Sequence, residues 1–272
     1  FLIGLILLKE LDKSGDINLP RFYLRRYLRL TPIYAVVALL YWWGNGSNAH
    51  TLWANLLYVN NFLPMDETAL RWTWTLAVEE QFYLLLPLLL LWLARRGAFW
   101  YWMTGLLALA FAIRAGVVAW FPDLYQQHMQ TLLADPVISD IYCEKLYDNL
   151  PTRYGPFVVG VMTAWVYLHR KTTLADWMTA HPQLTRCLHA SALGLFLFFA
   201  FFPINQTSAG QPGGFLSFYM VTHHNLFAIA VGWFMLYVFL NPDQPGILVR
   251  LLSWRGWQPF SQLTYSMYLT HM

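Results

Sequence analysis

The chain of 272 residues is 58% hydrophobic and 18% aromatic, and only 11% of its residues are charged. Ordinary soluble domains are about a quarter charged and under half apolar, so this composition excludes a water-facing globule. The net charge of +3 is too small to indicate nucleic acid as a partner. Composition therefore predicts an integral membrane protein.

Apolar runs follow one another along the chain. A stretch of roughly 18 or more apolar residues can cross a hydrocarbon core of about 30 Å. Eight segments are predicted: 1–8, 31–43, 73–94, 99–121, 154–169, 187–202, 218–240 and 260–272. We expect the first and last to be truncated, with about ten crossings in the full protein. The fold predicted is an all-α polytopic transmembrane helix bundle that forms a single membrane-embedded domain over 1–272.

The basic residues predict how these segments are oriented. Lysine and arginine accumulate in short cytoplasmic loops. Alternate connections carry 13 of the 17 basic residues: 9–29, 95–96, 170–186 and 250–255. We assign these connections to the cytoplasm. For the segment 31–43, Thr31 and Pro32 predict a helix start and Gly44 predicts its end.

Ionisable side chains inside a membrane are costly and mark candidate functional sites. Glu79, Glu80 and Arg114 are predicted to lie roughly 10 Å below the outer face, from a helical rise of about 1.5 Å per residue. The hairpin 95–98 is short, so the two helices that it joins should pack side by side. We therefore predict that Arg114 pairs with Glu79 or Glu80, and we assign Glu80–Arg114 as a structural ion pair.

Three histidines also fall in apolar segments. His223 and His224 are predicted in the layer of the two glutamates, and His271 past the midplane. The hypothesis is a polar chamber, in which a histidine could act as a general base oriented by a carboxylate. The alternative is a purely structural ion pair with interfacial histidines. The cysteine spacing predicts no metal site.

An arginine cluster lies on the predicted cytoplasmic side. In a helix Arg25 and Arg29 are four residues apart, and Arg26 and Arg29 three apart, so they share a face. Guanidinium groups on one face suit phosphates, so a phosphate-rich carrier such as coenzyme A could dock there. The alternative, which the cluster alone favours, is a positive-inside anchor with lipid headgroups.

The stretch Trp72-Thr-Trp-Thr-Leu-Ala-Val-Glu-Glu-Gln-Phe-Tyr-Leu-Leu-Leu-Pro87 resembles the signature helix of the acyltransferase-3 family of membrane acyltransferases. The family's Arg-x-x-Arg motif resembles Arg26 to Arg29, and its Tyr-x-x-Tyr-Leu-x-His motif resembles the stretch that ends at His271. The stretch 54–61 is similar to the branch that includes the nose-resistant-to-fluoxetine proteins. Together these motifs span nearly the whole chain.

The resemblance implies transfer of an acyl group, with acetyl expected, from cytoplasmic acyl-CoA to a hydroxyl of a glycan, lipid or small molecule. By the same resemblance Arg26 and Arg29 contact the donor, with Arg25 beside them. Glu79 sits in the reaction chamber and His271 lines it. The expected location is a bacterial inner membrane, with membrane lipid as a further partner and no metal.

One departure from the family pattern affects activity. The family's main catalytic candidate is a histidine on the first helix, which we expect to lie before Phe1, so this chain alone is expected to be inactive. The rival function is a transporter or channel whose intramembrane charges line a pathway. A silent membrane scaffold is a third alternative. The motifs favour the enzyme.

Overall fold

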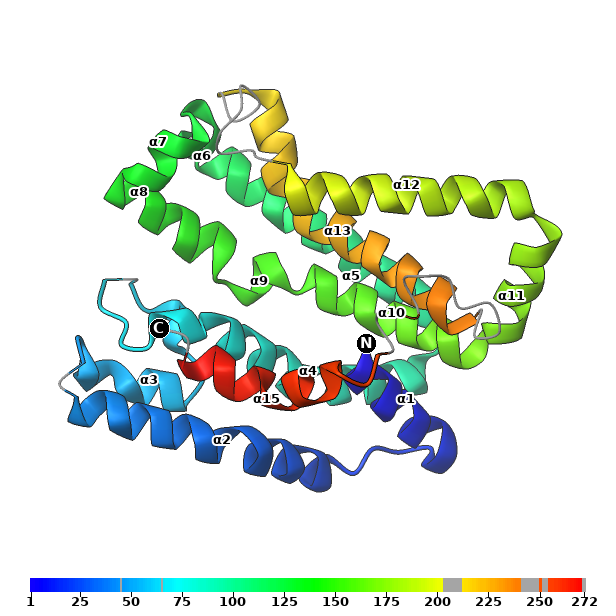
Figure 1. Cartoon of the computed structure of the whole chain (residues 1–272), viewed down its shortest axis with the longest axis horizontal. Helices are drawn as coiled ribbons and strands as arrows, with labels where there is room; N and C mark the ends of the chain where they lie inside the picture. The colour runs from blue at the N-terminus through cyan, green and yellow to red at the C-terminus, as the bar shows by residue number, and fades with distance from the viewer. Residues whose placement is uncertain (45, 65, 203–211, 241–249, 251–253, 271–272) are drawn as a thin grey trace. The chain divides into compact units, whose positions relative to one another are not determined.

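The computed structural model describes residues 1–44, 46–64, 66–202, 212–240, 250 and 254–270. Every regular element in this part of the chain is helical (Figure 1), which confirms the predicted all-α fold. The chain divides into two compact units. Unit 1 comprises 1–17 and 85–240, and unit 2 comprises 18–84 and 241–272. Each unit is described by itself.

Unit 1 holds most of the long apolar helices. Its helix α13 packs against α5, α10 and α12, and α1 packs on α10. The bounds are α1 (Leu2–Ser14), α5 (Phe99–Trp120), α6 (Asp123–Gln126), α7 (Met129–Ala134), α8 (Pro136–Ile141), the π-helix η4 (Tyr142–Tyr147), α9 (Leu150–Arg153), α10 (Gly155–His169), α11 (Lys171–Ala180), α12 (Pro182–Phe201) and α13 (Gly214–Leu240). Between α5 and α10 the chain thus forms a series of short helices.

Small residues allow close helix contacts in unit 1. A Cβ atom added to Gly232 of α13 would lie 2.7 Å from the Thr163 Oγ1 atom of α10. A Cβ atom on Gly4 of α1 would lie 3.3 Å from Val161 Cγ2, also on α10. Small residues at helix crossings are typical of helix packing in membranes, because they let the two backbones approach closely.

Unit 2 is built around α2 and the first half of α4. Helix α2 packs against α3 and α15, and α4 passes from unit 2 into unit 1 between Leu84 and Leu85. The bounds are α2 (Leu19–Trp43), η1 (Ala49–Thr51), α3 (Leu52–Leu56), η2 (Asn60–Phe62), η3 (Arg71–Thr73), α4 (Trp74–Arg96) and α15 (Trp257–Thr270). Buried Tyr34, Leu70 and Leu76 form part of its core.

Helix α2 begins earlier than predicted. The Asn18 side chain accepts a hydrogen bond from the backbone N–H of Arg21 at 3.0 Å, and Pro20 occupies the first turn. These two residues supply the cap that we had assigned to Thr31 and Pro32. Pro32 instead lies inside the helix, where it removes one backbone hydrogen bond. The predicted end at Gly44 is confirmed, since its N–H donates to the Leu40 carbonyl.

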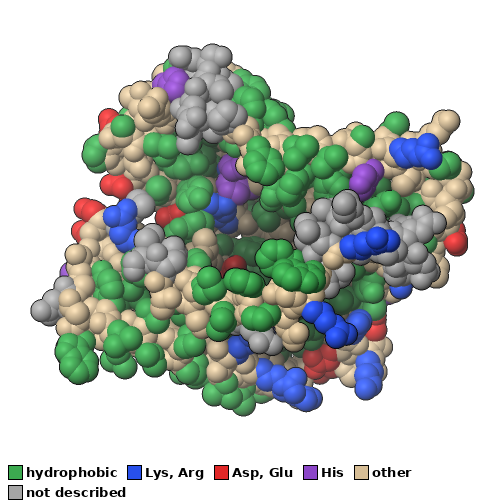
Figure 2. Space-filling model, in the orientation of Figure 1, with side chains coloured by type: hydrophobic (Ala, Val, Ile, Leu, Met, Phe, Trp, Pro, Cys, Tyr) green, Lys and Arg blue, Asp and Glu red, His purple; other side chains and the backbone are tan. Residues whose placement is uncertain are grey.

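Among the described residues, four helices are long and apolar enough to cross a membrane: Arg71–Arg96, Phe99–Trp120, Pro182–Phe201 and Gly214–Leu240. Hydrophobic side chains cover much of the face seen in Figure 2. Trp43 and Trp120 end α2 and α5 and are 82% and 80% exposed. Tryptophan is enriched at membrane–water interfaces, so exposed indoles at helix ends are typical of membrane proteins.

Candidate functional site

A bidentate ion pair joins α2 to α4 within unit 2. The Arg26 Nε atom donates to Glu80 Oε2 at 2.8 Å, and Nη2 donates to Glu80 Oε1. The guanidinium carbon lies 3.7 Å from the centre of the Tyr83 ring. The side chains of Arg26 and Glu80 are only 16% and 15% exposed. A charge-assisted pair of this geometry fixes both side chains and gives Arg26 a cation–π contact as well.

Arg25 and Arg29 lie on the exposed side of the same helix. The continuous α2 confirms that they are one helical turn apart. Neither makes a hydrogen bond or ion pair with any residue that the structure describes. The arginine cluster is therefore divided between one guanidinium held by Glu80 and two exposed ones.

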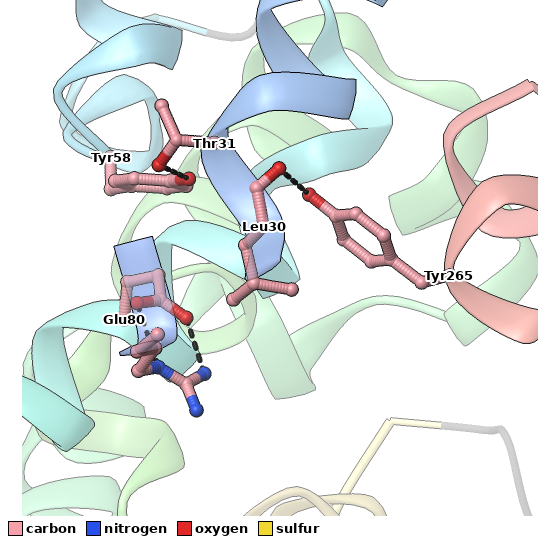
Figure 3. Close-up of polar contacts among 6 residues, drawn as sticks. Leu30, Thr31, Tyr58, Glu80 and Tyr265 are labelled. Atoms are coloured by element: carbon pink, nitrogen blue, oxygen red, sulfur yellow. Dashed lines mark hydrogen bonds and ion pairs between the residues drawn. The ribbon is translucent and has the colours of Figure 1, made fainter. Parts of the chain in front are cut away.

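Two tyrosines hold the middle of α2 from other elements of unit 2 (Figure 3). The Tyr58 hydroxyl lies 3.2 Å from Thr31 Oγ1, and the Tyr265 hydroxyl of α15 donates to the Leu30 carbonyl at 3.0 Å. Burial raises the pKa of Tyr58, and the negative charge of Glu80 also raises it, so this hydroxyl stays neutral. Together with Glu80 of α4, the segment that carries Tyr58 and helix α15 therefore contact the stretch 26–31 of α2.

Buried amides surround the start of α4, and we call them the amide cluster. Thr73 Oγ1 lies 2.7 Å from the Tyr34 hydroxyl and accepts from the Nδ2 atoms of Asn55 at 3.1 Å and Asn60 at 3.4 Å. Gln81 Nε2 donates to the Tyr58 carbonyl at 2.8 Å and to Asn61 Oδ1 at 2.7 Å. The cluster therefore ties the segment 55–61 to α4 beside Glu80.

Glu79 is half-buried next to this pair and makes no hydrogen bond or ion pair with the described residues. The charges that act on it are those of Arg26 and Glu80. One turn earlier on α4, the Thr75 hydroxyl lies 2.5 Å from the Tyr268 hydroxyl of α15. The other catalytic candidate, His271, lies outside the described residues.

Arg114 has other partners than the predicted one. It is 1% exposed, and its Nε atom donates to the carbonyls of Met220 and Val221 at 3.1 Å. Its Nη1 atom donates to the carbonyls of Thr152 at 2.9 Å and Leu146 at 3.4 Å. The predicted Glu80–Arg114 ion pair is wrong, because Glu80 pairs with Arg26 and backbone carbonyls surround the Arg114 guanidinium.

This arrangement makes Arg114 necessary for folding. We expect Arg114→Met to destabilise the protein by about 3 kcal/mol or more, because hydrogen bonds to a charged group contribute about 1.5–3 kcal/mol each. Arg114→Lys should recover only part of the loss, since one ammonium cannot reach carbonyls on three segments. Denaturant unfolding in detergent measures both variants. Wild-type stability of Arg114→Met would contradict this prediction.

The other polar candidates of unit 1 lie near Arg114. The rings of His223 and His224 are 3.6 Å apart between centroids, and His223 stacks on Tyr219 at 4.8 Å. Sequence reasoning missed Arg153, whose Nε atom donates to the Tyr147 carbonyl at 2.5 Å, and it missed Asn225, which is fully buried. Glu79 and Glu80 belong to unit 2, so the residues assigned to one chamber fall in two units.

The described residues contain no group of three or more His, Cys, Asp or Glu side chains that could hold a metal ion. The chemistry open to these residues is proton transfer and the binding of charged groups. In unit 2 the carboxylate of Glu79 could exchange a proton with a hydroxyl. The exposed Arg25 and Arg29 could bind phosphates.

Comparisons with known proteins identify the family of the chain. A family model described as an acyltransferase domain matches residues 1–272. The chain is 28% identical over 287 residues to "Nose resistant to fluoxetine protein 6" of Caenorhabditis elegans, covering 93% of this chain and 33% of that protein. It is 26% identical over 299 residues to a Staphylococcus aureus (strain COL) protein named "Putative O-acetyltransferase", covering 100% and 43%.

The chain thus spans less than half the length of these curated relatives. No solved structure matches it.

Proposed function

Since the chain belongs to the acyltransferase family whose domain model it matches over residues 1–272, we propose that the complete protein is an integral-membrane O-acyltransferase. It moves an acyl group, with acetyl expected, from acyl-CoA to a hydroxyl of a glycan, lipid or small molecule. The observation that carries the proposal is the half-buried carboxylate of Glu79, which has no hydrogen-bond partner among the described residues and adjoins the Arg26–Glu80 pair.

In this proposal the donor binds at the arginine cluster. Arg25 and Arg29 hold the phosphates of acyl-CoA, since their guanidinium groups are exposed and one turn apart. Arg26 is fixed by Glu80 through two of its N–H groups, which leaves its other N–H groups for the donor. Arg26 therefore links the donor to the helix that carries Glu79.

In this proposal Glu79, rather than the histidine expected before Phe1, acts as the general base towards the acceptor hydroxyl. It accepts the proton of the acceptor hydroxyl while that oxygen attacks the thioester carbonyl carbon. The tetrahedral intermediate then collapses, the C–S bond breaks, and the coenzyme A thiolate leaves and takes up a proton. By the family resemblance His271 lines the reaction chamber, and it is the second catalytic candidate. The family match favours this reaction over a transport pathway.

The proposed location is a multi-pass membrane protein of a bacterial inner membrane, with the arginine cluster on the cytoplasmic side. Four helices of sufficient length and apolarity support a multi-pass arrangement. The basic connections support the orientation. Membrane lipid is then a partner over the exposed apolar surface.

Donor binding tests the arginine assignment. In the full-length protein, the double change Arg25→Gln and Arg29→Gln should weaken acetyl-CoA binding about tenfold for each arginine, because each loses a charge-assisted contact with phosphate. Isothermal titration calorimetry in detergent measures the affinity.

The matched control is Arg95→Gln with Arg96→Gln. It removes the same charge from two exposed arginines on the same predicted membrane face, so acetyl-CoA affinity should stay within about twofold of the wild type. Unchanged affinity in the Arg25 and Arg29 variant would overturn the donor site and leave the cluster as a lipid anchor.

A further inference from the structure

Unit 1 has a polar centre where α9 meets α5 and α13. Its guanidinium groups come from Arg114 and Arg153, and Arg114 donates to the carbonyl of Thr152, the residue before Arg153. The Tyr147 ring lies 4.1 Å from the Arg153 guanidinium carbon and 6.3 Å from the His224 ring. These contacts bring two cations and a histidine together within an apolar unit.

The charges at this centre do not balance. The acidic group that acts on Arg153 is Asp148, whereas carbonyls alone contact the Arg114 guanidinium. Glu144 is paired with Lys145 at 3.3 Å, on side chains that are 31% and 49% exposed. The Arg114 guanidinium therefore has carbonyl partners but no carboxylate partner among the described residues.

Neighbouring aromatic groups add no negative charge. Burial raises the pKa of Tyr142, so its hydroxyl stays neutral. Tyr142 stacks on Tyr147 with 5.6 Å between ring centroids. The remaining titratable groups that face the centre are His223 and His224, which could only add positive charge. Uncompensated buried charge is costly, so the residual positive charge calls for a partner.

Buried hydrogen-bonding atoms at the same place also lack partners. Asn225 is 0% exposed, yet neither its Nδ2 nor its Oδ1 atom has a hydrogen-bond partner among the described residues. The Nδ1 atom of His224 is buried and unpartnered as well. Nearly all buried polar atoms in proteins make a hydrogen bond to protein, ordered water or a ligand, so these three atoms on adjacent residues mark a place that a polar group can occupy.

The Asn225 side chain packs against the start of α10. A Cβ atom added to Gly155 would lie 2.9 Å from Asn225 Cγ and 3.1 Å from the Ala110 Cβ atom. Asn225 follows Val221 by four residues on α13, so it lies on the face whose carbonyl accepts from Arg114. The amide is thus held one helical turn from the carbonyl that binds Arg114.

We propose that this cluster is a binding site for one anionic group, a carboxylate or a phosphate, carried by a polar ligand. The Asn225 amide and the His224 ring supply hydrogen bonds, and Arg114 and Arg153 supply the positive field. Arg114 itself stays bound to the carbonyls. The site lies in unit 1 and shares no residue with the donor site or with Glu79, so the two proposals stand or fall separately.

The change Asn225→Asp tests the charge of this site at constant size. With the full-length protein in a neutral detergent, we expect inorganic phosphate to raise the midpoint of thermal unfolding above that in chloride of equal ionic strength. In Asn225→Asp the new carboxylate takes the place of the anion. Its midpoint without phosphate should exceed that of the wild type, and its apparent phosphate affinity should fall at least tenfold.

Two control variants complete the design. Asn225→Leu should lose the phosphate response, and its unfolding midpoint without phosphate should not exceed that of the wild type. Arg25→Gln with Arg29→Gln should keep the full response, which separates this site from donor binding. A wild-type midpoint equal in phosphate and chloride would overturn the proposal, and so would an Asn225→Asp protein that unfolds more easily or does not fold.

A second arm identifies the source of the anion. The midpoint of thermal unfolding is measured in phosphate-free nanodiscs of anionic or zwitterionic phospholipid. A higher midpoint in the anionic phospholipid would assign the group to a lipid headgroup, provided that Asn225→Asp abolishes the difference. A response to phosphate alone would assign it to a soluble ligand.

Discussion

Glu79→Gln is expected to reduce the turnover of the full-length protein by about 10²-fold or more, with little change in stability. The amide keeps the size of the side chain but cannot accept a proton, and a general base contributes about 10²–10⁴-fold to a rate. The carboxylate makes no hydrogen bond with the described residues, so its loss breaks no contact there. Acetyl-CoA consumption in the presence of a hydroxyl acceptor measures turnover.

The matched control is Glu67→Gln, an exposed glutamate in the same unit. It removes the same charge and should keep wild-type turnover. If Glu79→Gln retained full turnover while the protein was properly folded, Glu79 would have no role as a base. A higher KM for acetyl-CoA with an unchanged kcat would indicate that Glu79 takes part in donor binding instead.

A large loss of stability is also expected for Glu80→Leu. It leaves the Arg26 guanidinium, only 16% exposed, without its carboxylate. Removing one partner of a buried pair costs about 3–5 kcal/mol, because the other charge stays buried and uncompensated. Replacing both residues, Arg26→Met with Glu80→Leu, should recover most of this loss, since no orphan charge remains. Denaturant unfolding of the wild type, Arg26→Met, Glu80→Leu and the double variant forms a double-mutant cycle.

Glu144→Ala is the control for this cycle. It breaks the exposed pair with Lys145, and exposed pairs contribute about 0–1 kcal/mol. Additive effects of the Arg26 and Glu80 changes would show that the two side chains do not stabilise each other.

The helices and the arginine cluster could be predicted from the sequence because they depend on local signals. Apolar runs identified α5, α12 and α13, and a spacing of four residues placed Arg25 and Arg29 on one face. The start of α2 was missed because Thr31 and Pro32 carry the same capping signal as Asn18 and Pro20. Which of two adequate caps is used depends on packing, which the local pattern does not contain.

The partner of Arg114 could not be predicted, for a different reason. The argument assumed that a buried guanidinium needs a carboxylate, and the short hairpin 95–98 suggested one on α4. Helix interruptions offer another solution, because carbonyls that do not accept helical hydrogen bonds can accept side-chain ones. Pro151, Pro156 and Gly155 mark such interruptions in the sequence, but they do not say which side chain will fill them.

The carbonyl partners of Arg114 also constrain the order in which the protein can be made. Arg114 precedes Met220 by 106 residues. During synthesis α5 is therefore complete well before the carbonyls of Met220 and Val221 exist. Until α13 is in place, a growing chain in the bilayer carries an arginine whose hydrogen bonds must come from water or from an insertion factor. We therefore expect this arginine to be least satisfied between the insertion of these two helices, and products truncated before α13 to be less stable than the complete chain.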